Sequence, residues 1–307
     1  MILDNHTLSN YRACFRKGWY RDQMKLEREG GMGAPALEFG IAWHGAMDEL
    51  YKSKNVILAG EVFKATYNPF WDAYPDEFKK REKRTPDLGL SMLLNYWLHW
   101  EAQVMKYEVL AIEQYFKFPL SPDHSYCGLV DKVLLDTDTG LVVGMDHKTT
   151  SRLSSAYIGQ MRISQQFRGY IYYLRHHSEF KDRMSNYFYA DFALTTKTSS
   201  HGADNAPFYR ETVLCDDDML DEWHANTLTQ IEMIQDRVDA TAGDPEGFNS
   251  IPQNTDACSN YASLCQYYDI CSAPVALRLN TIDHAYGEHT WNPADRVVEK
   301  PKELSDG

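Results

Sequence analysis

The 307-residue chain lacks any apolar run long enough to cross a membrane. Its opening residues, MILDNHTLSN, also lack the basic, apolar and small-residue segments of a secretory signal peptide. No internal repeat is present. Together these absences predict an intracellular globular protein, located in the cytoplasm and without membrane contact.

Positive charge is scarce as well: 31 Lys and Arg face 44 Asp and Glu, giving a net charge of −13. Affinity for phosphate comes from Lys and Arg, so this balance argues against broad, nonspecific binding of nucleic acid. Any contact with nucleic acid is expected to be local. The cluster at residues 79–84 (KKREKR) is one such place, although clusters of this kind are usually just solvated surface.

Six cysteines are present but no C-x-x-C pair, the usual mark of structural zinc. Three of them, Cys258, Cys265 and Cys271, fall within fourteen residues, and Cys14 is the candidate for a fourth ligand. Thiolates suit zinc or an iron–sulfur cluster. The wide spacing favours a cluster without excluding zinc or unrelated free thiols. The other two cysteines fall inside predicted strands and are expected to be small buried hydrophobic side chains: Cys127 and Cys215.

Hydrophobic periodicity predicts an α/β chain with a helical N-terminal part. Helices are expected at residues 8–30, 37–52, within 56–107, at 157–176 and from 216 onwards; strands are expected at 108–118, 126–150 as a hairpin, 186–197 and 207–215, with a polar loop at 198–206.

The hairpin at 126–150 carries acids inside apolar runs. A four-residue loop after Asp136 would place Asp131 directly opposite Asp146, with Lys148 on the same face, whereas a slip of one residue would separate the two acids. Adjacent carboxylates repel each other unless a cation lies between them, so this register implies a divalent metal. An exposed hairpin face with ordinary acids is the alternative.

Three other segments carry polar residues where chemistry is possible. His44 recurs with Leu37, Ile41, Met47 and Tyr51 on one helical face, where a histidine is more often a core residue than a ligand. Glu113 lies in a predicted strand and fits either surface or site. Gln166 and Tyr170 are four residues apart and share one side of a helix.

The candidate residues named above occur along the chain in an order that resembles the PD-(D/E)xK nucleases. The resemblance is in particular to the RecB-like and AddB-like exonuclease domains and to the CRISPR-adaptation nucleases that hold an iron–sulfur cluster. The ordered set spans about residues 8–275: Cys14, His44, Glu113, Asp131, Asp146-x-Lys148, Gln166-x-x-x-Tyr170, Cys258, Cys265 and Cys271. Each motif is weak alone, and the order carries the resemblance. These families commonly have a C-x-x-C among the late cysteines, which this chain lacks.

The resemblance implies a role for each residue. His44, Asp131 and Asp146 would hold Mg²⁺ or Mn²⁺, and Lys148 would be the catalytic lysine. Gln166 and Tyr170 would position DNA. A [4Fe–4S] cluster would be ligated by all four candidate cysteines: Cys14, Cys258, Cys265 and Cys271.

The implied fold is a restriction-endonuclease-like core, with a mixed central sheet flanked by helices and a cysteine-ligated cluster that joins the N- and C-terminal segments. One nuclease domain is expected over 1–280, divided at 107 and 197, before a loosely ordered tail at 281–307.

The implied function is metal-dependent cleavage of DNA, exonucleolytic at ends, in recombination or DNA processing. The protein would be a stand-alone nuclease of the phage type that works in a bacterial host cell. Two alternatives stay open: an inactive protein of the same fold that binds DNA or a recombination partner, and a zinc-stapled enzyme of another class.

Overall fold

The computed structural model describes residues 1–29, 34–195, 207–241, 244, 247–260 and 263–288. The chain forms two compact units. Unit 1 comprises Met1–Met32, Lys117–Gly128 and Glu222–Gly307, and unit 2 comprises Gly33–Phe116 and Leu129–Asp221. No helix in the described parts of the chain is long and apolar enough to span a membrane. The predicted division of the chain at 107, 197 and 280 stays a prediction.

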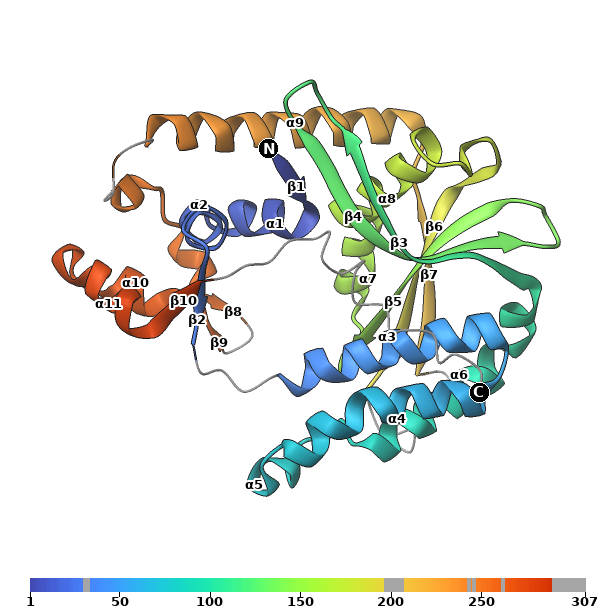
Figure 1. The fold of residues 1–307 in the computed structure, drawn as a ribbon. Helices are drawn as coiled ribbons and strands as arrows, with labels where there is room; N and C mark the ends of the chain where they lie inside the picture. Colours follow the sequence, from blue (N-terminus) through green and yellow to red (C-terminus); the bar gives the residue numbers. More distant parts are fainter. Residues whose placement is uncertain (30–33, 196–206, 242–243, 245–246, 261–262, 289–307) are drawn as a thin grey trace, which may run out of the picture. The chain divides into compact units, whose positions relative to one another are not determined.

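Unit 2 is built on a mixed sheet with helices packed on its faces (Figure 1). The strand order is β4–β5–β6–β7, and β3 also pairs with β4. The β4–β5 and β6–β7 ladders are antiparallel, whereas β5–β6 is parallel. The strands are β3 (Tyr107–Pro119), β4 (Ser125–Asp136), β5 (Val142–Thr150), β6 (Met184–Leu194) and β7 (Phe208–Leu214). This mixed α/β architecture agrees with the fold class that the sequence predicts.

The helices of this unit begin at clear sequence signals. Asn55 and Thr85 cap α4 and α6 by accepting hydrogen bonds from backbone N–H groups, and proline occupies the first turn of α3 and of α6. The helices are α3 (Pro35–Ser53), α4 (Val56–Ala73), α5 (Asp76–Lys79), α6 (Pro86–Lys106), α7 (Ser155–Arg162) and α8 (Gln165–His176), with a 3₁₀ turn at Lys181–Arg183. The long helix α9 (Asp217–Ala240) begins in unit 2 and continues in unit 1.

The core of unit 2 lies between α3, α4 and α6 and one face of the sheet. On α3 the buried residues repeat every three to four positions: Phe39, Ala42, Trp43, Ala46, Met47, Leu50 and Tyr51. The predicted apolar face was therefore wrong in its first two members, because Leu37 and Ile41 are 60% and 50% exposed. His44 lies at the border of the buried stripe rather than inside it.

For the strand at 108–118, alternation predicts a core face made of Leu110, Ile112, Phe116 and Phe118, and this alternation is also interrupted. Glu113 has a left-handed φ of 47°, which shifts the side chains that follow. Before this point Tyr107 is buried and Val109 packs against the core, whereas after it Phe116 and Phe118 are buried. Leu110 and Ile112 are only half-buried, contrary to the prediction. Glu113 itself is exposed.

The single helix predicted at 157–176 is two helices. Helix α7 ends at Arg162, and Ser164 then caps α8 by accepting a hydrogen bond from the Phe167 backbone. Serine at such a position competes with helix continuation because its hydroxyl satisfies a free N–H of the next helix. As a result Gln165 and Gln166 open α8 instead of lying in its middle.

Unit 1 combines short elements from both ends of the chain. These are β1 (Ile2–Asp4), α1 (Asn5–Ala13), α2 (Phe15–Gly18), a π-helical turn (Trp19–Gln23), β2 (Leu26–Arg28), β8 (Ser259–Asn260), β9 (Ser263–Leu264), α10 (Tyr268–Ser272), α11 (Arg278–Ala285) and β10 (Tyr286–Glu288), with 3₁₀ turns at Gly247–Ser250, Thr255–Ala257 and Val275–Leu277. Strand β1 pairs in parallel with the first residues of β4, and β10 pairs antiparallel with β2.

Two predictions for unit 1 need correction. The helix expected at 8–30 is broken at Cys14, whose backbone is extended (φ −159°, ψ 120°), and it gives way to β2 at Leu26. The predicted loose tail is ordered in its first part, since residues 281–288 complete α11 and form β10. The rest of that tail, and the predicted loop at 198–206, lie outside the described residues.

Candidate functional site

The hairpin of β4 and β5 has the register that brings two acids together. Lys132 pairs with Met145 and Leu135 with Val142, so Asp131 and Asp146 are the next facing residues. At the turn, the Asp136 N–H donates to the Leu141 carbonyl (2.9 Å), as the predicted four-residue loop requires. The predicted register is therefore confirmed.

Helix α3 brings His44 to the first of these acids. The distance from His44 Nδ1 to Asp131 Oδ2 is 3.1 Å. The same carboxylate oxygen accepts a hydrogen bond from the His147 backbone N–H (3.0 Å), which ties Asp131 to the neighbouring strand. Asp131 is thus held from two sides, by a helix and by β5.

The second acid is paired with the lysine two residues later on β5. Lys148 Nζ lies 2.6 Å from Asp146 Oδ2, and it also donates to Gln166 Oε1 on α8 (3.3 Å). Gln166 in turn donates through Nε2 to the Tyr170 hydroxyl (2.8 Å). The predicted set His44, Asp131, Asp146, Lys148, Gln166 and Tyr170 is therefore brought together within unit 2.

The charges of this group are strongly coupled. Burial and the neighbouring charge of Asp131 raise the pKa of Asp146 to about 6. Burial alone would raise the pKa of Asp131 too, but the His44 and Lys148 charges outweigh burial and hold it well below its usual value. The pKa of Lys148 is raised because the two carboxylates outweigh its burial, so the amine stays protonated. The negative charge of Asp146 is thus incompletely compensated by Lys148 and His44.

A family model matches most of the chain. Residues 6–272 match the model of the PD-(D/E)XK nuclease superfamily. The chain belongs to this superfamily. Its members are typically metal-dependent nucleases, and they commonly use Mg²⁺ or Mn²⁺. No curated protein matches the chain significantly.

The predicted D-x-K motif is Asp146-His147-Lys148, and its middle residue belongs to a buried polar network that sequence reasoning missed. His147 Nδ1 lies 2.8 Å from Asp191 Oδ2, and Asp191 Oδ1 accepts a hydrogen bond from Arg210 Nε (2.8 Å). Tyr96 also donates its hydroxyl to Asp191 (2.7 Å). The three charged or titratable groups stand in register across β5, β6 and β7. Their signal in the sequence is a polar residue inside each of three apolar strands.

A second missed contact fixes α3 against β4. Lys132 is fully buried, and its Nζ donates to Asp48 Oδ1 at 2.5 Å. Asp48 lies one helical turn beyond His44, so α3 contacts two consecutive residues of β4, Asp131 and Lys132. This double contact sets where His44 lies along the strand. The sequence contains both charges but no sign that they pair.

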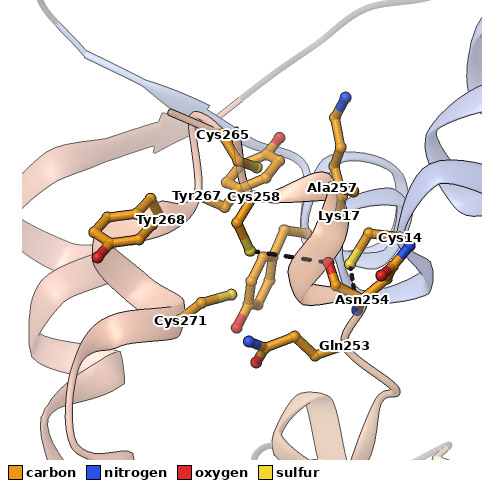
Figure 2. A pocket seen from close by; sticks show the side chains of 11 residues that line it. Cys14, Lys17, Gln253, Asn254, Ala257, Cys258, Cys265, Tyr267, Tyr268 and Cys271 are labelled. Carbon is orange, nitrogen blue, oxygen red and sulfur yellow. Dashed lines mark hydrogen bonds between the residues drawn. The ribbon is translucent and has the colours of Figure 1, made fainter. Parts of the chain in front are cut away.

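The four candidate cysteines of the sequence lie around one pocket in unit 1 (Figure 2). Its lining includes Cys14, Cys258, Cys265 and Cys271. The Cys14 sulfur accepts a hydrogen bond from the Asn254 backbone N–H (3.3 Å), and burial raises the pKa of Cys271 despite the nearby Arg16. The other two cysteines are buried in strand β4 and just after β7, as predicted: Cys127 and Cys215.

The wide spacing of the first two late cysteines has a structural reason. Strands β8 and β9 form a small antiparallel hairpin in which Ser259 pairs with Leu264. The next facing pair is Cys258 and Cys265, and the Cys265 N–H donates to the Cys258 carbonyl (2.8 Å). Strand pairing in this hairpin thus brings the two cysteines together across six intervening residues, so a C-x-x-C turn is not needed.

Across the described residues, no group of three or more His, Cys, Asp or Glu side chains is arranged to hold a metal ion. At the β4–β5 hairpin, His44 and Lys148 directly contact the carboxylates of Asp131 and Asp146. The donor types nevertheless suit the implied groups: the carboxylate oxygens suit Mg²⁺ or Mn²⁺, and four thiols suit an iron–sulfur cluster.

Proposed function

We propose that the protein is a divalent-metal-dependent deoxyribonuclease whose site is the group around the β4–β5 hairpin. The observation that carries the proposal is the facing pair Asp131 and Asp146 with Lys148 and His44 on their carboxylates. The pKa of Asp146 is raised because its burial and the charge of Asp131 are not fully compensated by the neighbouring cations. A divalent cation is the ligand that would remove this cost.

In this proposal, His44, Asp131 and Asp146 hold Mg²⁺ or Mn²⁺, which supplies an activated water and offsets charge on the scissile phosphate. Without metal, Lys148 is an ammonium group, because the two carboxylates outweigh its burial and raise its pKa. In this proposal it donates hydrogen bonds to a phosphate oxygen or to the water. Gln166 orients the lysine through its amide oxygen, and with Tyr170 it faces the DNA.

The finer parts of the proposal are exonuclease action at DNA ends and a role in recombination or DNA processing, as a stand-alone nuclease of the phage type. A [4Fe–4S] cluster held by Cys14, Cys258, Cys265 and Cys271 belongs to the same proposal. Its support is that Cys14, distant in sequence, lines one pocket with the three late cysteines, and that a backbone N–H is directed at its sulfur. Amide hydrogen bonds to sulfur are a common means of tuning such clusters.

The test is degradation of end-labelled DNA in Mn²⁺ by the wild type, Asp146→Ala and Lys148→Ala. Both variants are expected to lose at least about 10²-fold in rate, because each removes a charge at the reacting phosphate. Asp138→Ala is the matched control, since this acid is exposed in the turn of the same hairpin. It should keep the wild-type rate.

Label position and DNA topology extend the same assay. Labels at the 5′ and 3′ ends report polarity, and a closed circular substrate should remain intact if the enzyme needs an end. Full activity of Asp146→Ala or Lys148→Ala would contradict the proposed site. DNA that is retarded but never shortened would show a binding protein of this fold instead.

A further inference from the structure

Residues 79–84 of unit 2 (the basic loop), which run from the last residue of α5 into the connection to α6, carry positive charge that their own acid does not neutralise. Glu82 is the only acid in it, and its carboxylate faces inward with 16% exposure. Glu82 Oε1 accepts hydrogen bonds from the backbone N–H of Lys83 (2.8 Å) and Arg84 (2.9 Å), and it pairs with the Arg84 guanidinium (3.1 Å). The acid therefore fixes the loop's shape.

Three cations of the basic loop point to solvent: Lys80, Arg81 and Lys83 are exposed. Among the described residues, no ion pair involves any of them, whereas Lys79 pairs with Asp76. The six residues carry five positive charges and one negative charge in a protein whose net charge is −13. Such a concentration on a shaped loop favours a polyanionic partner.

A row of aromatic rings leads to the same loop. The ring of Trp71 stacks near Tyr74 (6.4 Å between centroids), and Tyr74 lies 6.1 Å from Phe78. Phe78, directly before the loop, is 42% exposed. An exposed ring beside free cations is the combination that binds unpaired bases and their phosphates.

The basic loop is anchored on the helical hairpin that carries His44. Helices α3 and α4 run side by side, and α5 follows α4 (Figure 1). The Tyr67 hydroxyl of α4 donates to the Arg84 carbonyl (2.5 Å), and the Tyr67 ring lies 5.3 Å from that of Phe39. Phe39 precedes His44 by five residues, about 8 Å along the axis of α3. These contacts connect the basic loop to the helix that carries His44.

We infer that the basic loop and Phe78 form a binding surface for single-stranded DNA, an inference that rests on the proposed nuclease function. Lys80, Arg81 and Lys83 contact successive phosphates, and the Phe78 ring stacks on a base. A base face is accessible only in an unpaired strand, which is why a single strand fits and a duplex does not. The surface would hold a separated strand while its end lies at the metal-binding acids.

The test measures binding of fluorescent oligo(dT) by anisotropy, in EDTA so that no cleavage occurs, across a series of salt concentrations. The variant carries Lys80→Ser, Arg81→Ser and Lys83→Ser. Its dissociation constant is expected to rise at least about 10-fold, and its log–log salt slope to fall in magnitude by about 2, since each phosphate contact on a single strand contributes about 0.7. A charge-matched control removes three exposed cations elsewhere in unit 2: Lys52→Ser, Lys181→Ser and Arg183→Ser.

Phe78→Ala separates stacking from charge. It should weaken binding to oligo(dT) by about 5-fold or more with an unchanged salt slope, because it removes a ring and no charge. Thermal unfolding of each variant verifies that the fold is intact.

Two results would overturn the inference: equal losses in the loop variant and its control, or loss of duplex binding as large as that of single-strand binding. Cleavage in Mn²⁺ is scored separately. A wild type that binds oligo(dT) through the loop but never cleaves it contradicts the nuclease proposal alone.

Discussion

Two facing aspartates of unit 2 differ in what their charges do to stability. The pKa of Asp146 is raised to about 6 by burial and by Asp131, so without metal the folded state keeps this acid protonated up to about pH 6. Its contribution to stability is present at low pH and is lost as pH rises from about 4 to 6. Asp131 has a lowered pKa, so its charge stabilises the fold above its unfolded pKa, and this contribution is lost as pH falls.

The pair therefore predicts opposite outcomes for one chemical change. In EDTA at pH 7.5, Asp146→Asn should raise the free energy of unfolding by about 1–3 kcal/mol, and Asp131→Asn should lower it. Urea denaturation measures both. Added Mn²⁺ should stabilise the wild type but neither variant, because each lacks a proposed ligand. A loss of stability in Asp146→Asn would contradict the electrostatic account of the site.

His147 gives a second prediction at the scale of single residues. Burial and the charge of Lys132 lower its pKa to about 4, so the native imidazole is neutral at pH 5 while the unfolded one is charged. Stability that depends on the neutral ring is present above about pH 6.5 and is lost as pH falls towards 4. From pH 7 to pH 5 this loss is about 2 kcal/mol.

Comparison with His147→Gln isolates this effect, because Asp191 has a lowered pKa and stays ionised across this pH range, and His44 is present in both proteins. The variant is expected to lose about 2 kcal/mol less than the wild type between pH 7 and pH 5, measured by urea denaturation at each pH. Parallel pH profiles for the two proteins would show that the buried network does not depend on this ring being neutral.

At the scale of elements, the sequence predicts most where a pattern is local. The hairpin register followed from strand alternation and one four-residue loop, and it correctly placed Asp131 opposite Asp146. The face of α3 could not be predicted equally well, because Leu37 and Ile41 are apolar and yet 60% and 50% exposed. Periodicity identifies an amphipathic helix, but it does not show which neighbour covers each turn.

Contacts between elements were the part that could not be predicted. His147, Asp191 and Arg210 meet only because β5, β6 and β7 are adjacent in the sheet, and no local signal gives that order. The break between α7 and α8 is a milder case, since Ser164 is a recognisable cap inside a continuous hydrophobic pattern. The roles proposed for the site residues stay predictions until variants are assayed.

At the scale of the whole molecule, the cysteine pocket predicts a coloured protein. Protein purified without oxygen should show broad visible absorption and about four iron atoms per chain, and Cys258→Ser should lose both. The same variant should lower the free energy of unfolding by about 2–5 kcal/mol, the range for removing a native cross-link. Cys215→Ser is the control, because this thiol lies outside the pocket. A colourless protein with stoichiometric zinc would instead favour a zinc staple.

The composition of unit 1 from three separate stretches has a consequence for synthesis. Its first stretch ends at Met32 and its last begins at Glu222, about 190 residues later, whereas both stretches of unit 2 lie between these points. At 5–20 residues per second, the ribosome needs on the order of 10–40 s to cover that distance. The N-terminal residues, Cys14 included, therefore lack their partners from Glu222 onward until those residues have been synthesised. The nascent chain completes the unit with the candidate nuclease site before the unit with the cysteine pocket.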